Sequence, residues 1–181
     1  GVVAAETQLC DLDGINGRLA YRGYEIGDLA RNATFEETCY LLWHGRLPNR
    51  AQLGDLQSQL AAARPLPESI LRLMKMLPPS DGMDALRTLT SALGHYDQDA
   101  HDNSLQASYR KAVRLTGQIA SLVATWGRMQ EGGGPIAPDP VMGHAANFLY
   151  MLTGQRPNPT EIRAMDIALT LHADHELNAS T

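Results

Sequence analysis

The chain has 181 residues, 44% of them hydrophobic and 19% charged, and a formal net charge of −5 at pH 7. This composition is ordinary for a single globular domain with a hydrophobic core. Nucleic acid is not expected as a partner, because a phosphate-binding surface needs an excess of Lys and Arg on one face. No apolar run approaches the length of a membrane span, and no leader-like segment precedes the first predicted element. Cys10 and Cys39 form neither a disulfide framework nor a C-x-x-C motif, which predicts a soluble protein of the reducing cytoplasm.

A small β-hairpin is predicted at the start of the chain. Residues 2–9 are followed by Asp13-Gly14 and Asn16-Gly17, dipeptides that favour left-handed turn conformations, and then by residues 18–21. The short stretch 25–31 that comes next has its apolar residues on one side, as a helix would.

Helical signals dominate the rest of the chain. Thr34 with Glu37 three residues later is a capping-box pattern, and Gly45 and Gly154 are placed to end helices. Asp139-Pro140 is predicted to cap a helix that begins at Val141. The resulting fold is all-α apart from the hairpin, with seven or eight helices and no repeat. Those after the first are predicted over residues 34–45, 49–60, 68–77, 81–95, 103–130, 141–152 and from 158 onward.

The helix predicted over residues 103–130 is the longest. Its second half is apolar at nearly every turn, so we expect it to be buried inside the domain or against a second subunit. Small residues on it, Gly117, Ala120 and Ala124, would let another helix approach closely.

Several other patterns have a structural interpretation that is simpler than a functional one. Met74 and Met76 are predicted to fill the core. His44 stands at a helix end, where an imidazole interacts with free carbonyls. The acidic stretch 95–103 contains possible metal ligands, but nothing fixes them, and a solvated loop is predicted. The Gly132-Gly-Gly-Pro135 loop lacks the Lys-Ser/Thr of a phosphate cradle and is predicted to be a linker.

The end of the sequence brings two histidines and two carboxylates close together. Asn158 is a good N-cap, Pro159 suits the first helical position, and Glu161 can complete a capping box. His172 and His175 are three residues apart, so both imidazoles are predicted to project from one face of this helix.

Such a histidine pair has three possible uses. It can bind a carboxylate or carbonyl oxygen, it can ligate a metal, or it can be buried and satisfied. The helix dipole favours imidazolium, as do Asp174 and Glu176 beside the pair, and this suits an anionic ligand. No further cluster with ligand spacing supplies a third metal ligand, so no metal is predicted. Spacing alone leaves the structural interpretation open.

The C-terminal segment His172-Ala-Asp-His175-Glu-Leu-Asn178-Ala-Ser-Thr resembles the citrate synthase family in its short bacterial form. The resemblance covers essentially the whole chain. The other segments that carry it, in order, are Gly1-Val-Val-Ala-Ala-Glu-Thr, Asp13-Gly14, Tyr21-Arg22-Gly23-Tyr24, Phe35-Glu-Glu, Leu41-Leu-Trp-His-Gly-Arg-Leu-Pro48, Met83-Asp-Ala-Leu-Arg-Thr88 and His144-Ala-Ala-Asn-Phe-Leu-Tyr-Met-Leu-Thr-Gly.

This resemblance implies an acyltransferase that condenses acetyl-CoA, as co-substrate, with oxaloacetate and water to citrate and CoA, the entry step of the tricarboxylic acid cycle. It implies that His172 and His175 help bind oxaloacetate and that Asn178 lies close to the same pocket. It implies no cofactor, and a homodimer formed through helical faces.

The family's catalytic aspartate and second active-site histidine are expected beyond Thr181. Residues 1–181 are therefore expected to be the N-terminal part of the large helical domain, without the small domain, and to be inactive alone. Two alternatives stay open. One is a 2-methylcitrate synthase that uses propionyl-CoA, and the other is a truncated, non-catalytic dimerisation partner.

Overall fold

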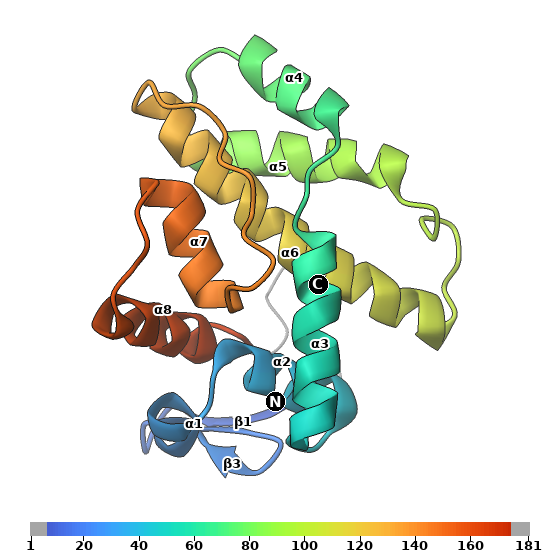
Figure 1. Cartoon of the computed structure of the whole chain (residues 1–181). Coiled ribbons are helices and arrows are strands. Elements are labelled where there is room, and N and C mark those ends of the chain that lie inside the picture. Colours follow the sequence, from blue (N-terminus) through green and yellow to red (C-terminus); the bar gives the residue numbers. More distant parts are fainter. Residues whose placement is uncertain (1–6, 175–181) are drawn as a thin grey trace. The chain divides into compact units, whose positions relative to one another are not determined.

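The computed structural model describes residues 7–174, and within them the protein is all-α apart from one small sheet, as predicted (Figure 1). The described residues form eight α-helices, one 3-10 helix and three strands. Two compact units make up the chain. Unit 1 comprises residues 1–56 and 159–181, and unit 2 comprises residues 57–158. Unit 1 therefore joins two stretches of sequence that the whole of unit 2 separates.

The sheet of unit 1 is antiparallel, in the order β1-β2-β3. β1 (Cys10–Asp13) pairs with β2 (Arg18–Tyr21), which confirms the predicted hairpin. Its first strand follows the predicted stretch 2–9: residues 7–9 are not part of it, and residues 2–6 lie outside the described residues. The Asp13 side chain closes the turn, because its Oδ1 accepts hydrogen bonds of 3.0 Å from the backbone N–H groups of Ile15 and Asn16.

The third strand, β3 (Tyr24–Glu25), was not predicted. Arg22 and Gly23 connect it to β2, and both have positive φ, 50° and 85°. Two such residues make a tight turn whose twist matches the flanking strands. An arginine in the first of these positions is no usual turn signal, which is why the sequence did not reveal it.

Four helices contribute to unit 1: α1 (Ile26–Asn32), α2 (Phe35–His44), the first half of α3 (Arg50–Ala63) and α8 (Pro159–Leu171). The predicted starts of α2 and α8 are confirmed.

The capping box of α2 is present in full. The backbone N–H of Glu37 donates to the Thr34 hydroxyl (3.3 Å), and the Glu37 carboxylate accepts from the backbone N–H of Thr34 (2.8 Å). At the other end Gly45 takes the left-handed conformation, with φ 74°, and its N–H donates to the Leu41 carbonyl.

A small apolar cluster lies under the sheet and the first two helices of unit 1. Cys10 belongs to it and is buried, because it begins β1 opposite Tyr21. The buried members are Cys10, Tyr21, Leu29, Ala33 and Leu41.

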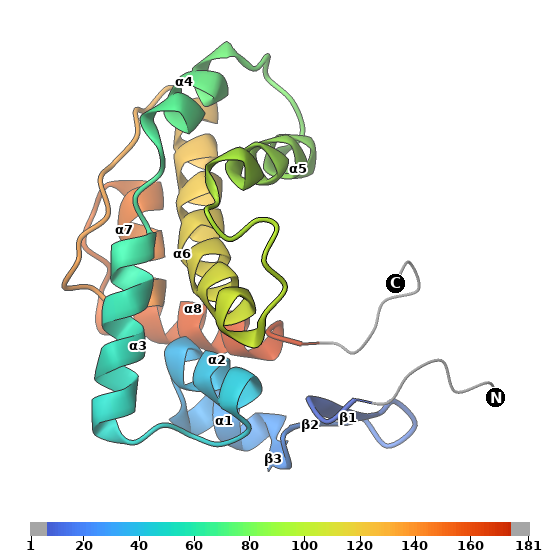
Figure 2. The ribbon, with the colours of Figure 1, turned by 90° about the vertical axis from the view of Figure 1, so that its right-hand side faces the viewer.

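Unit 2 contains the rest of α3, then α4 (Glu68–Met76), α5 (Gly82–Leu93), the 3-10 helix η1 (Gly94–Tyr96), α6 (Leu105–Gln130) and α7 (His144–Thr153). The long α6 is the axis of this unit, and both α5 and α7 pack against it (Figure 2). Its start lies close to the predicted residue 103, and Ser104 is its N-cap, since the Ser104 hydroxyl accepts from the N–H of Ala107 at 3.2 Å.

The core of unit 2 is apolar and is shared by α4, α5 and α6. Met74 is fully buried in it, as predicted, but Met76 is 80% exposed, so the core role predicted for Met76 is wrong. A residue two positions further along a helix lies on nearly the opposite face, so Met76 points away from the core that holds Met74. The buried members are Ile70, Met74, Ala85, Leu89, Leu93, Leu122 and Trp126.

Gly117 on α6 lets α3 approach closely, as predicted. A Cβ added at this glycine would lie 3.1 Å from atoms of Ala63 and from the Leu60 carbonyl oxygen. Any larger residue at position 117 would therefore push α3 and α6 apart.

The start predicted for α7 is wrong. The helix begins at His144 with Gly143 as N-cap, not at Val141. Asp139 uses its side chain locally instead: one oxygen accepts from the N–H of Val141 (3.0 Å) and the other from Arg156 (2.8 Å). The residues before His144 are thereby fixed as an irregular turn.

In the part of the chain that the structure describes, no helix combines the length and the apolar character needed to cross a bilayer.

Candidate functional site

The described part of the predicted site is the end of α8. His172 follows Leu171, the last residue of that helix, and its side chain is exposed. Its Nδ1 lies 2.7 Å from the carbonyl oxygen of Ala168, one turn earlier. When Nδ1 donates in this bond, Nε2 is the nitrogen that remains to meet a ligand. His175 and Asn178, the other two predicted residues, lie outside the described residues.

Polar side chains attach α8 to the rest of unit 1. Its two most buried residues are Asp166, 7% exposed, and Thr170, 0% exposed. By contrast, its apolar residues Ile162, Met165 and Leu169 are only partly buried.

Arg163 binds the end of α1. Its guanidinium donates to the carbonyl oxygen of Ala33 at 2.7 Å and also to that of Ala30. The last carbonyls of a helix lack partners within the helix and carry its negative dipole end, so a cation is favourable there.

Asp166 binds the start of α2. Its Oδ1 accepts a hydrogen bond of 3.1 Å from the backbone N–H of Phe35, the first residue of that helix. Burial raises the pKa of Asp166, and the Phe35 hydrogen bond and the charge of Arg163 partly oppose that rise. The two neighbouring helix ends thus each receive the charge that their dipole favours.

Thr170 continues this face of α8. Its hydroxyl lies 3.3 Å from that of Thr38 on α2, and both residues are fully buried. Because Thr38 donates its own proton to the Thr34 carbonyl (3.1 Å), Thr170 is the donor between the two hydroxyls. We call Arg163, Asp166 and Thr170 the polar clamp.

The polar clamp determines which way His172 faces. Its members are three and four residues apart and therefore share one face of the helix. His172 lies nine residues after Arg163, which is about two and a half turns and places it about 180° away. Asp166 and Thr170 are buried and Arg163 is partly buried, so this face points into unit 1 and the histidine is directed outward.

Beyond the helix end, the backbone is held by Tyr21 of β2. The tyrosine is 0% exposed, and its hydroxyl lies 2.9 Å from the Asp174 carbonyl oxygen, 3.2 Å from the Asp174 nitrogen and 3.4 Å from the Leu171 carbonyl oxygen. Sequence reasoning assigned no role to Tyr21, Arg163 or Asp166. An Arg and an Asp three apart on a helix look like an ordinary surface pair.

The stretch 95–103 is less solvated than predicted. Asp97 and Asp99 have side chains only 17% and 15% exposed, and both are ion-paired with arginines of α6. The Arg110 and Arg114 guanidinium groups hold the pKa of Asp99 well below its usual range. Among residues 7–174, no group of three or more His, Cys, Asp or Glu side chains could hold a metal ion.

His44 packs on its own helix. Its ring centroid lies 4.1 Å from that of Tyr40, one turn earlier. Partial burial, together with the charge of Arg46, lowers the pKa of His44.

Unit 2 contains a buried basic pair that sequence reasoning did not single out. Arg64 is 1% exposed and donates to the carbonyl oxygens of Asp139 (3.1 Å) and Met142 (2.8 Å). Burial and the charge of Arg64 lower the pKa of His144 to about 4, so His144 is neutral near pH 7. Arg64 fixes the turn that precedes α7, and no spacing signal in the sequence marks it.

Comparison with known proteins gives a family for this arrangement of helices. Residues 1–181 match the family model described as "Citrate synthase, C-terminal domain". The chain belongs to the citrate synthase family.

Two relatives and one solved structure illustrate the similarity. The chain is 45% identical over 186 residues to a citrate synthase of Haloferax volcanii and 46% identical over 183 residues to citrate synthase 2 of Bacillus subtilis; each alignment covers 100% of this chain and 49% of the relative. The chain thus spans about half the length of these curated relatives. The citrate synthase of Thermoplasma acidophilum, solved with carboxymethyl coenzyme A and oxaloacetate, superposes with a TM-score of 0.92 at 27% identity, over 99% of this chain and 47% of that one.

Proposed function

We propose that the protein containing this chain condenses acetyl-CoA with oxaloacetate and water, giving citrate and CoA. Membership of the citrate synthase family supports this reaction, as does the relative that was solved with oxaloacetate and a coenzyme A derivative. The observation that carries the proposal for this chain is the exposed His172 at the end of α8.

In this proposal His172 and His175 bind oxaloacetate, and Asn178 lies in the same pocket. Oxaloacetate carries two carboxylates and a ketone, so imidazole N–H donors can hold it and stabilise the charge that develops on the ketone oxygen during attack.

Two further groups are proposed to lie beyond this chain. A carboxylate takes a proton from the methyl group of acetyl-CoA, and a histidine stabilises the enol that forms. The enol carbon then attacks the ketone, and water cleaves the thioester to release CoA. Residues 1–181 are accordingly proposed to be the N-terminal part of the large helical domain, with no catalytic residue of their own. The relatives' greater length supports this division.

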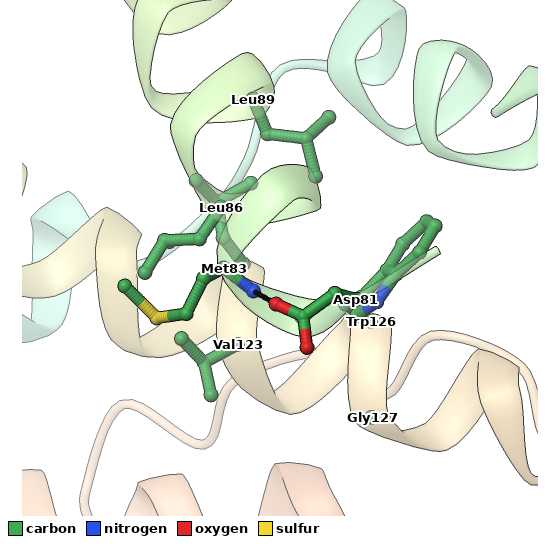
Figure 3. Close-up of a pocket in the computed structure, with 9 residues that line it drawn as sticks. Asp81, Met83, Leu86, Leu89, Val123, Trp126 and Gly127 are labelled. Atoms are coloured by element: carbon green, nitrogen blue, oxygen red, sulfur yellow. Dashed lines mark hydrogen bonds between the residues drawn. The ribbon is translucent and has the colours of Figure 1, made fainter. Parts of the chain in front are cut away.

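A homodimer is also proposed, through α5 and α6. These helices border an apolar cavity of about 350 Å³, lined by Met83 and Leu86 on one side and by Val123 and Trp126 on the other (Figure 3). Met83 is 71% exposed and Val123 39% exposed, so a second copy would cover apolar surface that this chain leaves in water.

The dimer proposal is tested by measuring molar mass in solution for the full-length protein. Met83→Asp should shift the mass from dimer toward monomer, because a carboxylate would have to be buried in the interface. Met76→Asp is the matched control, since Met76 is 80% exposed on α4 and does not line the cavity. A dimer that both variants leave intact would exclude this face. A cytoplasmic location stays a prediction from the cysteine content.

Activity is tested by thiol release from acetyl-CoA on addition of oxaloacetate, with an intact-mass spectrum of the same sample. The full-length protein should release thiol and the 181-residue chain alone should not. Activity with this chain as the only species would contradict the placing of the catalytic groups. Propionyl-CoA in parallel separates a citrate synthase from a 2-methylcitrate synthase. A full-length protein that is inactive with both, but copurifies with a complete subunit, would favour a non-catalytic dimerisation partner.

The oxaloacetate site is tested by His175→Ala in the full-length protein. Oxaloacetate affinity should fall about tenfold or more, since a hydrogen bond to a charged ligand group is lost. The unfolding temperature should change little by comparison. Unchanged oxaloacetate affinity would contradict the assignment of this histidine.

A further inference from the structure

Tyr21 joins the sheet of unit 1 to the far end of the same unit, about 150 residues later in the chain. Its hydroxyl is within hydrogen-bond distance of the Asp174 nitrogen, 3.2 Å, and of the Asp174 carbonyl oxygen, 2.9 Å. It also lies 3.4 Å from the Leu171 carbonyl oxygen. A phenol is both donor and acceptor, so one side chain can bind this N–H and one of the two carbonyls together.

These bonds fall at the end of α8 and just beyond it. Leu171 is the last residue of the helix, and its carbonyl is one of the four that a helix leaves unsatisfied. The Asp174 N–H comes just after the helix, where no repeating backbone pattern is available. The phenol of Tyr21 thus acts as a cap at the end of α8 that comes from a distant strand: its two shorter contacts hold the backbone of Asp174 just beyond the helix, and the Leu171 carbonyl lies farther away, at 3.4 Å.

The cap is rigid because the ring is enclosed. Tyr21 is 0% exposed and packs in the cluster that contains Leu29, Ala33 and Leu41. A ring held on all sides cannot move its hydroxyl without moving the cluster. Burial also raises the pKa of Tyr21, so the phenol keeps its proton through the neutral range.

His172 lies inside the segment that this cap fixes. We propose that Tyr21 is a positioning residue for the oxaloacetate site: its hydroxyl fixes the backbone from Leu171 to Asp174 and thereby fixes where His172 is presented. This inference rests on the proposed function for the identity of the ligand, but the geometry at Tyr21 stands without it. The polar clamp sets the rotation of α8, and Tyr21 sets the path of the chain after the helix ends.

The test is Tyr21→Phe in the full-length protein, which removes the hydroxyl and keeps the ring in the cluster. The KM for oxaloacetate should rise about tenfold, because the donors of the site are no longer held in register. The KM for acetyl-CoA should change less than about twofold, since the change is confined to oxaloacetate binding. Tyr24→Phe is the matched control: Tyr24 is 42% exposed on the neighbouring strand and should leave both constants unchanged.

A second readout follows the backbone itself. Amide hydrogen exchange in a peptide covering residues 171–174 should be faster in Tyr21→Phe than in the parent, while residues 159–168 keep their protection. A variant with a lower unfolding temperature but an unchanged KM for oxaloacetate would overturn the proposal and leave Tyr21 a purely structural residue. Unchanged exchange at residues 171–174 would overturn it as well.

Failure of the proposed function gives a different result. The parent protein would then neither bind oxaloacetate in calorimetry nor release thiol. In that case the exchange comparison alone decides whether Tyr21 fixes the end of α8.

Discussion

Two helices of nearly equal length, α8 of unit 1 with 13 residues and α5 of unit 2 with 12, are held in place by opposite kinds of interaction. The buried residues of α5 are Ala85, Leu89 and Leu93, a plain apolar stripe. Those of α8 are Asp166 and Thr170, each hydrogen-bonded to α2.

The difference follows from how directional the two interactions are. Apolar burial is roughly proportional to area and tolerates small rotations or shifts of a helix. Hydrogen bonds weaken steeply once their angle and distance are wrong. A helix that must present one side chain to a ligand gains from the second kind of attachment, whereas a helix that only fills a core does not need it.

The largest effect on stability is expected in the apolar region. Leu89→Ala removes a fully buried side chain from the unit 2 core and should lower the free energy of unfolding by about 3 kcal/mol. Urea denaturation of the full-length protein measures it. Oxaloacetate affinity should stay the same, and a marked loss of affinity would mean that the two regions are not independent.

Breaking the polar clamp should lower the free energy of unfolding less than Leu89→Ala does, but it should weaken oxaloacetate binding more. Arg163→Met keeps most of the side chain and removes the bonds to the carbonyls of Ala30 and Ala33. The free energy of unfolding should fall by about 2 kcal/mol. Oxaloacetate binding should weaken several-fold, because α8 can then rotate. Arg87→Met is the control: its ion pair with Asp84 is exposed and should contribute almost nothing. Equal effects of the two substitutions would contradict the clamp.

The pH dependence of stability tests Asp166. Folding raises the pKa of the Asp166 carboxyl above its unfolded value of 3.8, so its contribution to the free energy of unfolding is fully present below pH 3.8. That contribution is lost as the pH rises through the pKa of the folded state. Asp166→Asn cannot ionise, and its amide oxygen can still accept from the Phe35 N–H. The difference in free energy of unfolding between variant and parent should therefore favour the variant more at pH 7 than at pH 4. Unfolding curves of both proteins at pH 4 and pH 7 measure this difference. A difference that does not change with pH would contradict the raised pKa of Asp166.

The smallest effect on stability is expected at His172. The side chain is exposed, so His172→Asn should change the free energy of unfolding by less than about 0.5 kcal/mol. Oxaloacetate affinity should nevertheless fall, as measured by calorimetry. A His172→Asn variant that is destabilised but binds oxaloacetate normally would mean that His172 has a structural role and does not bind the ligand.

Local sequence signals predicted the helices well where the capping partner lies within a few residues. The capping box at Thr34 and Glu37 and the cap at Ser104 are of this kind. The predicted start of α7 was wrong because Arg156 binds the side chain of Asp139 and Arg64 binds its carbonyl oxygen. Both arginines lie well away from Asp139 in the sequence.

The candidate site was predictable only in part, and for the same reason. The pattern of histidines and the family resemblance pointed to His172, which the structure places on an exposed helix end. What holds it there could not be predicted, since Arg163, Asp166 and Tyr21 bond to backbone groups about 130 to 150 residues away. Such contacts exist only once the chain has folded.

Two members of the polar clamp, Arg163 and Asp166, bind backbone atoms, and this makes their contacts tolerant of mutation on the partner's side. Arg163 binds the carbonyls of Ala30 and Ala33, and Asp166 binds the N–H of Phe35, so neither contact depends on the side chains at those three positions. Substitutions at the partly buried Ala30 or Phe35 can therefore leave α8 attached, whereas the buried Ala33, which packs in the apolar cluster, and positions 163 and 166 have no such latitude. Proline at position 35 is the exception. It is normally well accepted at the first position of a helix, but it has no N–H to offer Asp166.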